Sequence, residues 1–156
     1  MNVPAIIVRD ARPSDLALIV AFNVCLARET ESKVLDHDAL SRGVAAALAD
    51  PERLRYWIAE DPASGAVVGQ AAVTREWSDW RNGWLWWLQS VYVRADARQR
   101  GAFRSLHHAI RSAALESSDV VGLRLYVEHD NADARRTYDA LGFVPGGYEV
   151  YEEIFL

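Results

Sequence analysis

Three arginines, Arg98, Arg100 and Arg104, surround a single glycine, Gly101, in one short stretch of the chain. They follow an apolar run that ends in Val91-Tyr92-Val93 and precede apolar residues at helical spacing. Backbone N–H groups at the start of a helix lack intrahelical acceptors, and the helix dipole adds partial positive charge there. A basic turn of this kind can bind a phosphate or pyrophosphate group. The alternative is an ordinary strand–turn–helix junction with a solvated basic face, since the glycine patterns of nucleotide-binding loops are missing.

A second motif spans Asn131 to Phe143 and reads Asn-Ala-Asp-Ala-Arg-Arg-Thr-Tyr-Asp-Ala-Leu-Gly-Phe. Asn131 is placed to cap the start of a helix, and Gly142 is placed to cap its end. The phenol of Tyr138 is either a proton donor of the kind that general acid catalysis uses or a packed aromatic beside Leu141.

Taken together, the two motifs resemble those of the GNAT superfamily of acyl-CoA-dependent N-acetyltransferases. Residues 98–102 follow the family pattern Arg/Gln-x-x-Gly-x-Gly/Ala up to its last position, where Phe103 replaces a small residue. The second family pattern, Asn-x-x-Ala-x-x-x-Tyr-x-x-Leu-Gly-Phe, is matched in full. The order of the expected strands and helices fits the family along nearly the whole chain.

The resemblance implies acetyl-CoA as cosubstrate, without a metal. Its pantetheine arm would pair with the backbone of Val91 and Val93, in a cleft where strand 88–93 separates from strand 123–128. Tyr138 would protonate the departing thiolate, and Asn131 would contact the cofactor as well as cap its helix. The pyrophosphate would bind the turn, at Arg98, Gln99, Arg100, Gly101, Ala102, Phe103 and Arg104. Phe103 shares a helical face with Leu106 and Ile110, so its ring is expected in the core.

The acceptor amine needs a base, because deprotonating a lysine-like amine of pKa about 10.4 at pH 7.4 costs about 4 kcal/mol. Some members of the family carry a glutamate on the strand before Tyr-Val. Here that stretch has Gln89, which is no base and would position a water or the acceptor instead. Other acids border the expected acceptor side, and they either form an acidic mouth for a cationic amine or are solvated surface charges. The acceptor-site candidates are Glu29, Glu31, Glu76, Trp77, Asp79, Gln89 and Glu128.

Five of the six tryptophans lie between Trp77 and Trp87. Strand alternation puts Trp84 and Trp86 on one face of the sheet and Trp87 on the other. They are expected to pack beneath helices or in a subunit contact, or to form an aromatic wall for the acceptor.

The periodicity predicts a mixed α/β sheet, antiparallel in its early part and joined by crossover helices later. Asn82-Gly83 predicts a two-residue hairpin turn. Strands are expected at 6–9, 55–60, 67–76, 84–93, 123–128 and 147–155, and helices after Pro13, at 38–48, after Gly101 and at 131–141. This is the GNAT arrangement, in a single domain over residues 1–156.

Composition narrows the class of protein. A net charge of −5 argues against a nucleic-acid binder, and the single cysteine, Cys25, excludes an internal disulfide. The four histidines show no metal-ligand spacing, and no apolar run is long enough for a membrane span. We therefore expect a cytoplasmic protein without a nucleic-acid or membrane partner, possibly a homodimer.

The expected function is direct transfer of an acetyl group from acetyl-CoA to a primary amine of a small molecule or peptide. The alternative is a non-catalytic acyl-CoA-binding sensor of the same fold. A longer acyl-CoA as donor is a third possibility.

Overall fold

The computed structural model describes residues 5–155. They group into two compact units, one reaching to Leu125 and one running from Tyr126 onward. The first unit contains a five-stranded sheet in the order β1-β2-β3-β4-β5. The neighbours from β1 to β4 are antiparallel, and β4 and β5 are parallel, so the predicted mixed sheet is confirmed. The strands are β1 (Ile7–Asp10), β2 (Arg55–Glu60), β3 (Val67–Ser78), β4 (Gly83–Val93) and β5 (Val120–Leu125).

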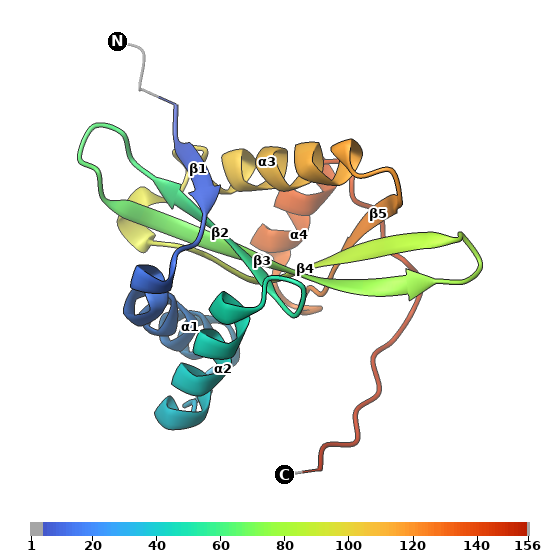
Figure 1. Ribbon diagram of the computed structural model, residues 1–156, viewed down its shortest axis with the longest axis horizontal. Helices are drawn as coiled ribbons and strands as arrows, with labels where there is room; N and C mark the ends of the chain where they lie inside the picture. The colour runs from blue at the N-terminus through green and yellow to red at the C-terminus, as the bar shows by residue number, and fades with distance from the viewer. Residues whose placement is uncertain (1–4, 156) are drawn as a thin grey trace. The chain divides into compact units, whose positions relative to one another are not determined.

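Helices cover both faces of this sheet (Figure 1). Helix α3 (Ala102–Glu116) lies on one face, and α1 (Leu16–Glu31) and α2 (His37–Ala49) lie on the other. The buried cluster under α3, which we call the α3-side core, includes Trp86, Leu88, Leu106 and Ile110. The opposite cluster, the α1-side core, includes Ile19, Val44, Ile58 and Ala72. The side chains of strand β2 alternate between the two cores, because Trp57 packs in the α3-side core and Ile58 in the α1-side core.

The β3–β4 hairpin forms, but the predicted two-residue turn at Asn82-Gly83 is wrong. The connection runs from Asp79 to Asn82, and Gly83 is already a strand residue opposite Ser78. Gly83 is needed for a different reason, which is the close approach of β5. A Cβ at this position would lie 2.4 Å from Cγ1 of Val121 and 2.9 Å from the carbonyl oxygen of Asp119.

Strand β5 begins and ends earlier than the predicted 123–128. Its parallel ladder with β4 runs from Trp84 opposite Val120 to Leu88 opposite Leu125. Strand β4 continues to Val93, beyond the end of that ladder. The backbone of β4 after Leu88 is therefore not engaged in a ladder with β5.

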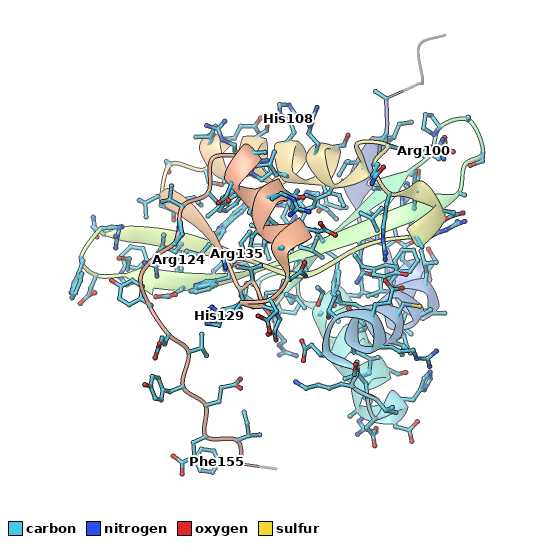
Figure 2. All side chains as sticks on the ribbon, turned by 180° about the vertical axis from the view of Figure 1, so that it is seen from behind. Arg100, His108, Arg124, His129, Arg135 and Phe155 are labelled. Carbon is cyan, nitrogen blue, oxygen red and sulfur yellow. The ribbon has the colours of Figure 1, made fainter. Side chains whose placement is uncertain are left out.

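The second unit contains α4 (Ala132–Ala140) and an extended C-terminal segment. The predicted strand over 147–155 is wrong, because no strand forms between residues 126 and 155. Figure 2 shows Phe155 near the end of this segment, and the apolar side chains of Tyr148, Val150, Tyr151 and Ile154 are also exposed. Alternating apolar residues favour a strand, but a strand also needs a neighbour to complete its backbone hydrogen bonds.

A partly buried ion-pair network predicts how the stability of the first unit responds to acid. The Arg9 guanidinium contacts Asp15 at 2.8 Å and Glu60 at 2.6 Å, and the N–H of Arg12 donates to Asp15 at 2.7 Å. The hydrogen bond from Arg9 holds the pKa of Asp15 below its usual value. Asp15 therefore stabilises the fold above about pH 4, and this contribution is lost as the pH falls through its folded pKa.

We expect Asp15→Asn to lower the free energy of unfolding at pH 7 by about 2 kcal/mol, and to flatten its decline between pH 5 and pH 2. Urea titrations at several pH values measure both effects. Asp10→Asn is the matched control, because Asp10 pairs with Arg55 at 2.7 Å in an exposed position and should cost less than about 1 kcal/mol. Equal losses in the two variants would contradict the special role of Asp15.

Candidate active site

The turn before α3 presents a run of backbone N–H donors. Gln99 and Gly101 have φ values of +61° and +85°, both in the left-handed region. The first backbone bond of α3 runs from the N–H of Ser105 to the carbonyl of Gly101. Within residues 5–155, no acceptor contacts the N–H groups that precede it at Gln99, Arg100, Gly101, Ala102 and Arg104. Successive N–H groups in this kind of turn form a concave anion site.

Gly101 keeps this turn open. A Cβ added there would meet no protein atom within 4 Å, and the φ of +85° is one that side chains rarely adopt. Phe103, the departure from the family pattern, packs against the α3-side core, with its ring 6.4 Å from that of His107. The prediction that Phe103 belongs to the core is confirmed, so a large side chain at this position is compatible with backbone contacts from the turn.

The three arginines of the turn differ in their contacts. Arg98 donates from Nε to the carbonyl of Val93 at 3.0 Å, and its guanidinium pairs with Glu29. Arg100 reaches toward the loop after β2, where its Nη2 lies 3.8 Å from Oδ2 of Asp61 (Figure 2). Arg104 is exposed on the first turn of α3. Arg98 therefore fastens the turn to the end of β4, whereas Arg100 and Arg104 add charge at its surface.

A bulge in β4 changes which side chains face each core. Gln70 lies opposite Tyr92 and Ala72 opposite Gln89, so Ser90 and Val91 together face Ala71. Before the bulge, Trp86 and Leu88 belong to the α3-side core, and after it Val91 and Val93 pack there. The prediction for the tryptophans holds before the bulge, because Trp84 and Trp86 both pack on the α3 side.

Glu29 is held at the end of β4. Its carboxylate accepts a hydrogen bond from the Tyr92 hydroxyl at 3.0 Å and pairs with Arg98. The Arg98 hydrogen bond holds the pKa of Glu29 below its usual value, and burial raises the pKa of Tyr92 to about 12. A carboxylate with a lowered pKa is a weak base. Glu31, the last residue of α1, pairs instead with Lys33 at 2.5 Å.

The acids near the hairpin have their own partners at the other end of β4. Glu76 accepts a hydrogen bond from Nε1 of Trp87 and lies 3.5 Å from Nη1 of Arg124, a residue labelled in Figure 2. Glu76 stands opposite Leu85, and Glu29 contacts Tyr92, which lies seven residues, or about 23 Å at 3.3 Å per residue, farther along the strand. The structure thus separates these two carboxylates along β4, and each has its own basic partner.

The remaining hairpin candidates also form local contacts. Gln89 donates from Nε2 to Oγ1 of Thr74 on the neighbouring strand. Trp77 is half exposed and meets the ring of Trp84 edge-on at 5.0 Å. Asp79 accepts from the backbone N–H of Trp80 at 2.9 Å.

In the second unit, the C-terminal end of α4 explains the spacing between Tyr138 and Phe143 in the second motif. The N–H of Phe143 donates to the carbonyl of Tyr138 at 3.0 Å, and the N–H of Gly142 donates to Asp139 at 3.0 Å. With Gly142 at φ +88°, these bonds make a Schellman motif, which normally brings the two side chains at its ends together. Here they are Tyr138 and Phe143, whose rings meet edge-on at 5.9 Å. Local backbone geometry thus orients the Tyr138 ring, and burial raises the pKa of its hydroxyl.

The start of α4 is capped as predicted. Oδ1 of Asn131 accepts from the N–H of Ala134 at 3.0 Å, which leaves its Nδ2 as a donor. In the preceding loop Glu128 is exposed, and Arg135 donates to the carbonyl of His129 at 3.2 Å (Figure 2).

The sequence patterns did not predict a role for one residue of this region, Gln70. Gln70 is completely buried, and its side chain donates to the carbonyl of Ser90 in the bulge at 3.2 Å. The signal was a single large polar residue within the apolar run 67–73.

No helix within residues 5–155 is both long and apolar enough to cross a membrane. No three His, Cys, Asp or Glu side chains in the same range gather as metal ligands would.

Comparisons with known proteins now identify the fold. The chain is similar over its length to a possible acetyltransferase from Clostridium difficile 630, with 42% identity, a TM-score of 0.87, and coverage of 97% of this chain and 98% of that one. It shares its fold with a predicted acetyltransferase from Clostridium acetobutylicum solved with acetyl-CoA, at 18% identity and TM-score 0.76, covering 96% of each chain. The same holds for a ribosomal-protein-alanine N-acetyltransferase from Brucella melitensis biovar Abortus 2308, at 16% identity and TM-score 0.75, covering 97% of this chain and 99% of that one.

No protein of curated function matches the chain. The model of the acetyltransferase (GNAT) family matches residues 22–143, a range that includes the turn, β4, α3 and both family motifs. The chain therefore belongs to the GNAT family of acetyltransferases.

Proposed function

We propose that this protein transfers an acetyl group from acetyl-CoA directly to a primary amine of a small molecule or peptide. The observation that carries the proposal is the run of N–H groups from Gln99 to Ala102, which have no acceptor among the described residues, next to the end of β4. Such donors suit the pyrophosphate of a coenzyme A ester.

The residues of the turn fit that ligand in charge and in space. Gly101 leaves room for close approach of a phosphate, and Arg100 and Arg104 add positive charge. The amide groups of the pantetheine arm would pair with the backbone of Val91 and Val93, where β4 has no ladder with β5. Acetyl-CoA supplies a thioester whose carbonyl carbon the amine nitrogen attacks.

Tyr138 is the proposed acid. As the carbon–sulfur bond breaks, its phenol gives a proton to the thiolate, while the attacking nitrogen gives a proton to water as the amide forms. The phenolate of Tyr138 then regains a proton from solvent, which restores the acid for the next turnover. A raised pKa keeps this phenol protonated across the neutral range.

We further propose that the enzyme prefers amines of low pKa. Gln89 stands where some relatives carry an acid, and Arg98 makes Glu29 a weak base. An α-amine with a pKa near 8 has much more free base at pH 7.4 than an alkylamine with a pKa of about 10.4. The expected acceptors are thus the α-amines of peptide termini.

Thiol release from acetyl-CoA tests the proposal, with an amine panel that pairs α-amines with alkylamines between pH 7 and pH 9.5. We expect release only when an amine is present. For alkylamines kcat/KM should rise about tenfold per pH unit, and for α-amines it should level off near pH 8. The alternative, a non-catalytic acyl-CoA sensor, predicts binding without release for every amine. Equal, pH-independent rates for both amine classes would contradict the preference for low pKa.

A further inference from the structure

The bulge in β4 contains a backbone conformation that needs support. Ser90 has a φ of +50°, which places a residue other than glycine in the left-handed region. Ser90 and Val91 have no opposite residue of their own, either in the register with β3 or in the register with β5. The strand ladders therefore do not hold these two residues, and other contacts must set their geometry.

A chain of buried side chains supplies that support. Gln70 on β3 is 0% exposed, and its Nε2 donates both to the carbonyl of Ser90 at 3.2 Å and to Oδ1 of Asn23 on α1 at 3.0 Å. Nδ2 of Asn23 in turn donates to the hydroxyl of Tyr56 on β2 at 3.3 Å. The chain thus ties three elements to one carbonyl group of the bulge.

Stability alone does not account for Gln70. No described group hydrogen-bonds to its Oε1, so the core contains an unsatisfied acceptor at this position. An unmade hydrogen bond in a buried place costs free energy that an apolar side chain of similar length avoids. The role of the Gln70 amide therefore lies in its hydrogen bond to the Ser90 carbonyl.

Holding this carbonyl also orients the next donor along the chain. The peptide group between Ser90 and Val91 is planar, and the structure has no cis peptide bond among its described residues. In a trans peptide the C=O and the N–H point in opposite directions. Because the Ser90 carbonyl points at the Gln70 amide, the N–H of Val91 points away from it.

We propose that Gln70 is a positioning residue for acetyl transfer. Through the Ser90 carbonyl it sets the direction of the Val91 N–H, at the part of β4 where the acyl-pantetheine arm is proposed to bind. The proposal rests on the proposed function, but the geometric part concerns the free protein and is tested there. Gln70 itself does not contact the substrate.

Three variants separate positioning from plain stability. Gln70→Met has a similar length and removes the donor to Ser90. Tyr56→Phe is the matched control, because it breaks the far end of the same chain and leaves the Gln70–Ser90 bond in place. Gln70→Glu is the conservative variant, since its carboxyl group can donate to Ser90 only when it is protonated.

The first measurement records the amide resonances of Ser90 and Val91 in isotope-labelled protein without ligand. We expect both to shift in Gln70→Met and to stay in place in Tyr56→Phe. Unchanged resonances in Gln70→Met would overturn the proposal. This result stands even if the wild-type protein acetylates no amine, so failure of the inference and failure of the proposed function can be told apart.

The second measurement compares kcat with stability. Gln70→Met should lower kcat at least about tenfold, because small displacements in an active site have large effects on rate. Its unfolding midpoint should fall no further than that of Tyr56→Phe, which should keep wild-type kcat. Gln70→Glu should recover kcat at low pH and lose it as the pH rises. The proposal would be contradicted if the loss of kcat followed the loss of stability in all variants. It would also be contradicted if Gln70→Glu were as slow as Gln70→Met at every pH.

Discussion

Replacing Tyr138 with phenylalanine should reduce kcat about 100-fold, because the departing thiolate loses its proton donor. Binding of acetyl-CoA should change little, since the anion site belongs to the turn before α3. The fold should also be retained, because phenylalanine keeps the ring contact with Phe143 and the Schellman bonds of α4 are made by the backbone. Steady-state kinetics with a saturating amine measures the effect.

The pH profile adds a second test of the same residue. An acid must be protonated to act, so its contribution is lost as the pH rises through its pKa. Burial raises the pKa of Tyr138 above the usual value of about 10, and wild-type kcat should therefore show no loss from this group up to pH 9.5. Tyr151→Phe is the control, because Tyr151 is an exposed tyrosine of the same unit. A Tyr138→Phe enzyme with full turnover would remove the catalytic assignment and leave Tyr138 as a helix-capping aromatic.

Replacing Gly101 with aspartate should weaken acetyl-CoA binding about 100-fold. A carboxylate beside the pyrophosphate repels it, and at a few ångströms this repulsion amounts to several kcal/mol near a protein surface. The same carboxylate at the N-terminus of α3 favours the helix, which offsets part of the strain that a side chain meets at the φ of +85°. Loss of binding beyond that of a neutral side chain with the same strain is the expected signature of an anion site.

Gly101→Asn provides the comparison of equal size. Asparagine tolerates a positive φ, and its Cβ would meet no protein atom within 4 Å. It should weaken binding only a few-fold, through steric contact with the ligand. If the aspartate and asparagine variants bind acetyl-CoA equally, the turn is not a phosphate site.

Much of the fold could be predicted from local patterns. Strand β2 has the predicted bounds, because Arg55–Glu60 alternates between two cores and is flanked by turn residues. The second motif could be recognised because its helix-capping geometry depends on one short stretch of sequence. The cap at Asn131 and the Schellman motif after Tyr138 both need only neighbours in sequence.

The errors concern features that depend on distant partners. The pair Asn82-Gly83 predicts a turn glycine, but the role of Gly83 is to admit Val121 and Asp119 of the neighbouring strand segment. The expected strand over 147–155 has a suitable apolar pattern, yet a pattern does not supply a neighbouring strand.

The contacts of the candidate site also depend on residues that are distant in sequence. The sequence leaves Glu29 and Glu76 either as acids of one mouth or as solvated surface charges, and their distance along β4 follows from contacts that no local pattern predicts. The hydrogen bond from Gln70 to the bulge depends on a register shift between β3 and β4, which cannot be predicted from a local sequence pattern.

The most direct test of the account is a calorimetric titration of the wild-type protein with acetyl-CoA and with acetylpantetheine, which lacks the pyrophosphate. Both ligands offer the same thioester and the same arm for β4, so their difference isolates the turn before α3. We expect micromolar binding of acetyl-CoA and at least about 100-fold weaker binding of acetylpantetheine, because acetylpantetheine lacks two charge-assisted hydrogen bonds to the turn. Equal affinities, or no binding of acetyl-CoA by the folded protein, would contradict the central claim.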